Sequence, residues 1–228
     1  MSFSGNVKEE LSKINNLAHK QQVIAELYGY MDTINTTSDK SEIKFSTESQ
    51  YNINRYSKFL KSIQIDYDID IQGKVFSITF KQNKFIKEKI EISTEIEKKA
   101  YIRGIFLGSG SLNDPNNTYH LEIILKDKDT AKKVINILEE FRINSKPLYR
   151  KKGYSIYIKE GEEISKLLFN PTTEGFILSY FFSISSGEIT NETLNFDSGT
   201  IWSKELILSS SVSTEKLVLA PFTLTFFV

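Results

Sequence analysis

The sequence predicts an α+β fold built from two copies of one helix–strand–helix–strand–strand unit, related by a pseudo-twofold axis. Three observations support this prediction. The apolar pattern recurs when 78 is added to each residue number, both copies switch between helical and strand periodicity in the same order, and a helix with a row of small residues precedes each copy. A duplicated unit of this kind places two similar α/β halves in one molecule.

The first copy occupies residues 43–80. Residues 43–46 alternate as in a strand, residues 56–63 follow helical spacing, and residues 65–71 and 75–80 alternate again around a Gly73-Lys74 turn. The second copy is found by adding 78 to each number. The matched apolar pairs are Ile43/Leu121, Phe45/Ile123, Tyr56/Val134, Leu60/Leu138, Ile63/Phe141, Ile65/Ile143, Phe76/Tyr154, Ile78/Ile156 and Phe80/Ile158. Because four elements keep their register, chance is a poor explanation.

The helix before each copy carries small residues at every fourth position. In the second copy a capping box at residues 94–97 starts this helix, which continues through residue 107. A glycine inside a helix costs about 1 kcal/mol relative to alanine, so it needs a reason in packing. We expect the two rows to face each other across the pseudo-twofold axis, the alternative being glycines merely tolerated in core helices. The rows are Ala25, Gly29 and Thr33, and Ala100, Gly104 and Gly108.

We divide the chain into a first repeat (1–82), a linker with the helix start (83–98), a second repeat (99–170) and an atypical tail (171–228). The second copy has a longer loop, at residues 112–118. The tail holds ten Ser, eight Thr, six acidic residues, two Lys and no Arg. Its apolar runs at residues 176–178 and 226–228 indicate strands or incidental hydrophobicity. Because the composition changes abruptly near residue 170, we expect a frameshift or truncation there, the alternative being a genuine replacement domain.

Composition excludes several classes of site. The chain has no cysteine, so it forms neither disulfides nor thiolate zinc sites. We expect His19 and His120 to be ordinary surface or packing residues, because neither has a nearby partner ligand. No apolar stretch is long enough to span a membrane and no leader pattern opens the chain, so we expect a cytoplasmic protein without a membrane partner.

Net charge is zero, but the charge is unevenly distributed along the chain. Residues 1–170 hold 27 basic and 23 acidic residues, a net +4, whereas residues 171–228 hold 2 and 6, a net −4. A surplus of this size permits nucleic-acid binding without requiring it.

Two α/β units joined through paired small-residue helices resemble the LAGLIDADG homing endonucleases. The chain resembles more closely the WhiA family of bacterial sporulation and cell-division regulators. The similar runs are MSFS and VKEEL at residues 1–11, FSTE at 45–48, YIRGIFLGSGS at 101–111, NDP at 113–115, YHLEI at 119–123, RKKGY at 150–154 and YIKEGE at 157–162. The resemblance covers residues 1 to about 168 and is more specific in the second copy.

The WhiA resemblance implies a nucleoid-associated, DNA-binding regulator of cell division, chromosome segregation or sporulation, with a transcription factor as a further partner. Family members carry a C-terminal helix-turn-helix domain after the two repeats. This chain departs from that pattern, since we find no helix-turn-helix in residues 171–228. A recognition helix without basic residues is a poor partner for phosphate.

The resemblance also indicates where catalytic acids would stand. A LAGLIDADG endonuclease takes one carboxylate from the end of each helix of the central pair to hold Mg²⁺. Aligned by the helix glycines, those positions are Ile34 and Ser109, and neither is a carboxylate. Asp32 lies two positions before the aligned position, and Asp114 lies in the longer loop. For both, an ordinary aspartate at a helix end or in a turn is the simpler interpretation. We expect no catalytic residue, no metal and no cofactor.

Strand alternation places polar and basic residues on one face of each sheet. In the second copy this face predicts DNA contacts through Lys126, Lys146, Arg150, Lys152, Tyr157 and Lys159. In the first copy it carries Lys44, Ser46, Ser77, Thr79 and Lys81, but also Asp66, Asp68 and Asp70, which repel phosphate. We therefore expect a DNA surface weighted toward the second copy, the alternative being an ordinary exposed face.

Three functions remain open at this point. The first is a non-enzymatic DNA-binding regulator, which the family resemblance favours. The second is a protein-binding scaffold on the same fold, which the sequence barely separates from the first. The third is a homing-endonuclease-type enzyme with displaced acids, which Ile34 and Ser109 disfavour.

Overall fold

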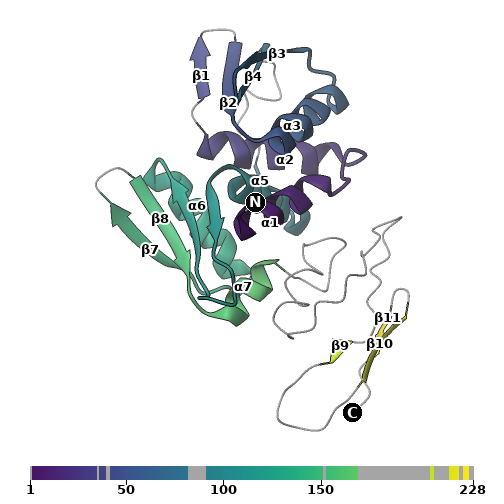
Figure 1. The fold of residues 1–228 in the computed structure, drawn as a ribbon, viewed down its shortest axis with the longest axis vertical. Coiled ribbons are helices and arrows are strands. Elements are labelled where there is room, and N and C mark those ends of the chain that lie inside the picture. Colours follow the sequence, from purple (N-terminus) through teal and green to yellow (C-terminus); the bar gives the residue numbers. More distant parts are fainter. Residues whose placement is uncertain are drawn as a thin grey trace.

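A computed structural model describes residues 2–34, 36–39, 42–81, 91–150 and 153–168, together with short strands between residues 206 and 225. Two helices, α2 (Lys20–Thr33) and α5 (Glu95–Ser109), cross at the centre, and a four-stranded sheet lies on either side of them (Figure 1). α1 (Phe3–Lys13) packs against α3 (Gln50–Ser62) and α5. This mixture of sheets and helices confirms the predicted α+β class.

The two antiparallel sheets have the same topology. The first has the order β1-β2-β4-β3, and its strands are β1 (Thr36–Asp39), β2 (Glu42–Thr47), β3 (Tyr67–Gln72) and β4 (Val75–Lys81). The second has the order β5-β6-β8-β7, and its strands are β5 (Gly110–Leu112), β6 (Leu121–Leu125), β7 (Lys146–Arg150) and β8 (Gly153–Ile158). α6 (Lys128–Glu140) follows β6 as α3 follows β2, and α7 (Gly161–Leu168) follows β8.

Each copy contains one strand more than the sequence predicted. β1 and β5 follow closely on the ends of α2 and α5 and pair with β2 and β6. β5 includes Leu112, which was expected in the loop, while the turn itself lies at residues 115–117. These strands are short and lack apolar alternation, so periodicity could not reveal them.

The strand register repeats at the predicted offset. Ile43 pairs with Phe80 in the first sheet, and the residues at the matching positions of the second copy, Leu121 and Ile158, pair in the second sheet. All four side chains are buried against the helices. The inward face of each sheet is therefore the one that alternation predicted.

The duplication extends to the backbone after α3 and α6. Gln64 and Arg142, which occupy matching positions in the two copies, both have left-handed conformations, with φ of 60° and 55°. The next N–H in each copy reaches back to a helix carbonyl, from Ile65 to Leu60 and from Ile143 to Leu138, at 2.9 Å in both cases. This is the Schellman type of helix ending, usually made with glycine.

The backbones of α2 and α5 are in direct contact at the small residues. A Cβ atom added to Gly29 would lie 2.1 Å from the carbonyl oxygen of Tyr101, and one added to Gly104 would lie 2.0 Å from that of Glu26. One added to Gly108 would meet the Thr33 hydroxyl. No larger residue fits at either central glycine without separating the helices. The two alanines of the rows, Ala25 and Ala100, are also buried.

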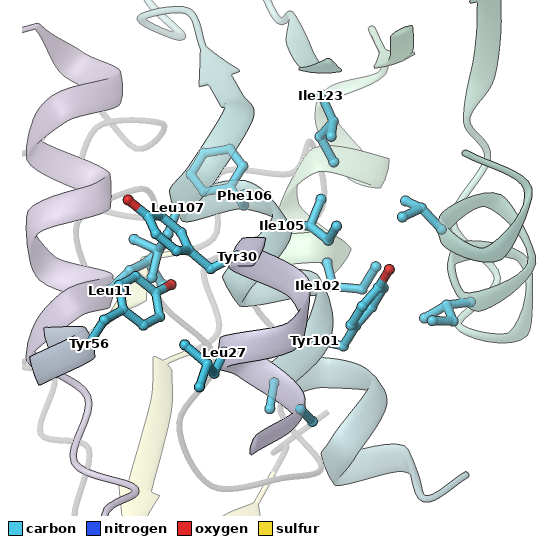
Figure 2. Close-up of a cluster of buried hydrophobic side chains, with 14 of the residues drawn as sticks. Leu11, Leu27, Tyr30, Tyr56, Tyr101, Ile102, Ile105, Phe106, Leu107 and Ile123 are labelled. Carbon is cyan, nitrogen blue, oxygen red and sulfur yellow. The ribbon is translucent and has the colours of Figure 1, made fainter. Parts of the chain in front are cut away.

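One continuous core runs through both copies and reaches α1 and α7. Figure 2 shows Tyr30 of α2 beside Tyr56 of α3, where the two rings stack with centroids 3.9 Å apart. Phe45 of β2 meets the Tyr30 ring edge-on at 5.6 Å. These contacts hold the first sheet and α3 on the central helix pair.

A buried ionic network, which the sequence did not reveal, crosses the helix interface. The Glu26 carboxylate is fully buried and accepts hydrogen bonds from Arg55 Nε at 2.5 Å and Arg103 Nε at 2.8 Å. Arg55 also donates to the carbonyls of Ser12 and Ile14. One carboxylate therefore joins α2, α3, α5 and the segment after α1.

Burial alone would raise the pKa of Glu26, but Arg103 and Arg55 outweigh this effect and hold the pKa below its ordinary value. The second copy places different chemistry at the same positions. There Tyr101 takes the place of Glu26 on the central helix, and Lys133 takes the place of Arg55 on the outer helix. The Lys133 ammonium lies 4.0 Å from the centre of the Tyr101 ring. A cation on the outer helix faces the central helix in both copies.

After α7, the structure describes only β9 (Leu206–Ile207), β10 (Lys216–Ala220) and β11 (Thr223–Thr225), in the order β11-β10-β9. The expected strands at residues 176–178 and 226–228 lie outside the described residues. Most of the region that was expected to lack a helix-turn-helix also lies outside the described residues, and so does the position of the expected frameshift. Among the described helices, none combines the length and apolarity needed to cross a membrane.

Replacing Gly104 with alanine tests the helix contact. Alanine would otherwise favour the helix by about 1 kcal/mol, yet the added methyl overlaps the Glu26 carbonyl, and overpacking typically costs about 1–3 kcal/mol. We expect Gly104→Ala to lower the free energy of unfolding, measured by chemical denaturation. The control is Gly161→Ala, where the new methyl meets only the movable ring of Tyr119. Equal effects from both changes would contradict a tight crossing.

Replacing Glu26 with glutamine tests the ionic network. Because the change leaves two arginines buried without their carboxylate, we expect a loss of about 3–5 kcal/mol at neutral pH. Glu140→Gln, which removes an exposed ion pair with Lys98, should cost at most about 1 kcal/mol.

The folded-state pKa of Glu26 is depressed, so its contribution is complete above the unfolded carboxyl pKa of about 4.3 and is lost as pH falls through the folded value. The stability difference between wild type and Glu26→Gln should therefore shrink in acid. A difference that stays constant at all pH values would show that Glu26 carries no charge.

Candidate nucleic-acid interface

Each sheet has an inner face, packed on helices, and an opposite outer face. On the second sheet the strand register places Glu122, Tyr157 and Lys146 in one row across β6, β8 and β7. A neighbouring row on the same face contains Ile124, Ser155 and Leu148. The outer face therefore combines basic, acidic, polar and aliphatic side chains, and its one carboxylate in these two rows, that of Glu122, accepts a hydrogen bond from the Ser155 hydroxyl.

Three of the predicted contacts lie together on this face. Lys146 is directly opposite Tyr157, and the Lys159 ammonium lies 5.4 Å from the centre of the Tyr157 ring. The His120 ring stacks over the same tyrosine at 6.3 Å. Arg150 is the last residue of β7 and pairs with Gly153 across the strand, whereas Lys152 lies outside the described residues.

Lys126 is placed differently from the other candidates. Its ammonium donates a hydrogen bond to the carbonyl of Ile34, where α2 ends. Burial lowers the pKa of Lys126, and the nearby carboxylates of Asp32 and Asp127 partly oppose this effect. This lysine therefore interacts with the negative end of the α2 dipole. It does not join the group formed by Lys146, Tyr157 and Lys159.

The outer face of the first sheet has the opposite charge balance. Lys44 and Lys81 share it with the exposed carboxylates of Glu42, Asp68 and Asp70. Asp68 occupies the position that a lysine of β7 takes in the second copy. On the outer face of the first sheet, carboxylates therefore outnumber lysines.

Two serine hydroxyl groups on the outer face of the first sheet hydrogen-bond to each other. The hydroxyl oxygens of Ser46 and Ser77 lie 2.8 Å apart, and Thr79 is half-buried beside them. These residues connect β2 to β4, so their contribution is to the sheet itself.

Sequence reasoning overlooked the aliphatic centre of the second outer face. Ile124 and Leu148 are 53% and 41% exposed, on either side of the buried Ser155. Alternation already assigned these positions to the outward side, and this was the available signal. Exposed aliphatic residues within a basic face suit contact with a partner surface.

The ends of the central helices hold no pair of carboxylates at the positions aligned with catalytic acids. Ile34 caps α2, and the Ser109 hydroxyl at the end of α5 donates to the carbonyl of Ile105 at 3.4 Å. Asp32 accepts a hydrogen bond from the Tyr101 hydroxyl at 2.7 Å. With the Lys126 ammonium also at this point, the residues do not fit a divalent cation.

Asp114 stabilises the turn in which it lies, because its carboxylate accepts a hydrogen bond from the backbone N–H of Asn116 at 2.9 Å. Within the described residues there is no group of three or more acidic or histidine side chains arranged to hold a metal ion. The displaced-acid interpretation therefore has no supporting geometry at Asp114.

Comparison with known proteins places these features in a family. Residues 98–173 match the model of the WhiA LAGLIDADG-like domain. The probable cell division protein WhiA of Clostridium botulinum (strain Hall) is 33% identical over 201 residues, covering 74% of this chain and 64% of that protein. The chain belongs to the WhiA family. The corresponding protein of Thermoanaerobacter pseudethanolicus is 32% identical over 203 residues, covering 74% and 63%. The chain thus spans just under two thirds of the length of these WhiA relatives.

Solved structures give the same fold. Full-length DUF199/WhiA from Thermotoga maritima superposes with a TM-score of 0.72 at 22% identity, covering 84% of this chain and 69% of that one. The N-terminal LAGLIDADG domain of DUF199/WhiA gives 0.65 at 26% identity, covering 75% and 94%. The homing endonuclease I-DmoI, in complex with DNA and Mn, gives 0.52 at 15% identity, covering 64% and 94%. These comparisons confirm the LAGLIDADG-like fold and the WhiA resemblance.

Proposed function

We propose that this WhiA-family chain is a non-enzymatic, DNA-binding regulator of cell division, acting through transcription, chromosome segregation or sporulation. The observation that carries the proposal is the basic outer face of the second sheet. Family relatives named as cell division proteins support the cellular role, and a fold neighbour solved with DNA supports the type of partner.

Lys146 lies opposite Tyr157 on β7, and the Lys159 ammonium lies 5.4 Å from the centre of its ring, whereas Glu122 lies opposite it on β6. The two lysines supply positive charge beside a tyrosine hydroxyl, a group that also hydrogen-bonds to phosphate. Ile124 and Leu148 lie beside them, where aliphatic groups contact thymine methyls if the face enters a major groove. The acidic outer face of the first sheet repels the backbone. DNA therefore contacts the molecule on one side only, through the second copy.

The proposed absence of nuclease activity rests on the helix ends. Cleavage of this kind needs carboxylates that position a metal ion and its water. Ile34 and Ser109 provide none, and the Lys126 ammonium at the Ile34 carbonyl opposes a second cation. In this proposal the chain shares the fold of a homing endonuclease but not its cleavage chemistry.

A protein-binding scaffold is the second candidate, because Ile124 and Leu148 also suit a transcription-factor partner. The two candidates differ in their dependence on salt. Binding to DNA weakens steeply as counterions compete for phosphate, whereas an aliphatic protein contact does not.

We expect Lys146→Glu with Lys159→Glu to weaken DNA binding equally for different sequences. For each phosphate that the variant no longer neutralises, the slope of log affinity against log salt should fall by about 0.9. Fluorescence anisotropy with labelled duplexes across a salt series measures both quantities. The matched control is Lys44→Glu with Lys81→Glu on the first sheet, since Lys81 occupies the position of Lys159 in that copy. Equal losses from the two pairs would show that binding is not one-sided.

We also expect supercoiled DNA to stay intact when the protein is incubated with Mg²⁺ or Mn²⁺, because neither helix end offers a carboxylate pair. Gel electrophoresis over time provides the measurement. Specific nicking that Asp32→Asn or Asp114→Asn abolishes would instead favour the enzyme with displaced acids.

A further inference from the structure

The two sheets end in edge strands of opposite character. β3 closes the first sheet and β7 closes the second, and neither pairs with another strand along its free side within the described residues. They belong to separate sheets on either side of α2 and α5 (Figure 1). Such edges are usually shielded, so exposed apolar residues on them mark a contact surface.

The acidic edge, as we call it, consists of residues 68–71 in β3. Ile69 and Ile71 are 46% and 61% exposed, although the register directs them to the inner face that α3 covers elsewhere. They alternate with Asp68 and Asp70, which are also exposed. The edge thus presents aliphatic side chains on one side and carboxylates on the other.

The basic groove lies between α6 and β7. Tyr149 is 67% exposed and meets Tyr154 edge-on at 5.5 Å, forming an aromatic wall. Exposed Lys128 and Lys132, one helical turn apart, line the opposite side. The remaining lining residues are Ala131, Ile135, Pro147, Leu148 and Ser155. With its lysines and its aromatic wall, this groove is complementary in chemistry to an aliphatic segment with acidic neighbours.

The same positions in the other copy do not carry these charges. Lys128 and Lys132 correspond to Gln50 and Asn54 of α3, and Asp68 corresponds to Lys146. Two acidic edges facing each other would repel, as would two basic grooves. Only the combination of an acidic edge with a basic groove is complementary.

We propose that copies of this chain associate head to tail, with the acidic edge of one copy seated in the basic groove of the next. Ile69 and Ile71 then pack against Tyr149 and Ile135, and the aspartates face the groove lysines. Because the two surfaces differ, each contact leaves one surface of each kind free, and the assembly can extend. This inference does not depend on the proposed DNA binding.

Sedimentation velocity of the full chain, over a concentration series, tests the proposal. We expect wild type to sediment faster as concentration rises, and less so at high salt because the contact is partly electrostatic. Ile71→Lys and Tyr149→Glu should each remain monomeric, with unchanged melting temperatures, because both side chains are largely exposed. Ile96→Lys, at a 49% exposed position on α5, should associate as wild type does.

A mixture of the two single variants gives the sharpest result. Each retains one intact surface, so equal amounts should form a complex of one copy of each and nothing larger. Wild type that stays monomeric at every concentration would overturn the proposal. So would a mixture that stays monomeric, or single variants that still form dimers.

Discussion

The backbones of α2 and α5 touch at Gly29 and Gly104, and this contact determines where both sheets lie. Each helix leads into an edge strand, so fixing the crossing fixes β1 and β5, and through pairing the rest of each sheet. Glu26 stabilises the crossing from inside, because it binds one arginine from its own copy and one from the other. The outer faces inherit their positions from this central pair.

The duplicated plan, the strand register and the inward faces could be predicted because they depend on local periodicity. Ile43 and Leu121 take equivalent partners in the two sheets, as alternation required. β1 and β5 escaped prediction because their pairing is set by the strands beside them and not by their own pattern. A strand as short as β5 carries no periodic signal.

The candidate site was predicted less completely, for reasons of long-range chemistry. Alternation placed Lys146 and Tyr157 on one face, and the register puts them side by side. Strand alternation places Lys126 on the same face, yet its ammonium donates a hydrogen bond to the carbonyl of Ile34, 92 residues earlier in the chain. The ionic network of Glu26 was missed for the same reason. A glutamate within an apolar helix signals a buried partner, but the sequence does not say which arginine supplies it.

Sharing one carboxylate between two copies has a consequence for how the molecule unfolds. Neither copy can separate without leaving the Glu26 charge short of an arginine and exposing the backbone around Gly29 or Gly104 to water. We therefore expect local opening to stop at the central helices and both halves to lose their structure in a single cooperative transition. Amide hydrogens in α2 and α5 should then exchange only through global unfolding, as slowly as the slowest in the molecule.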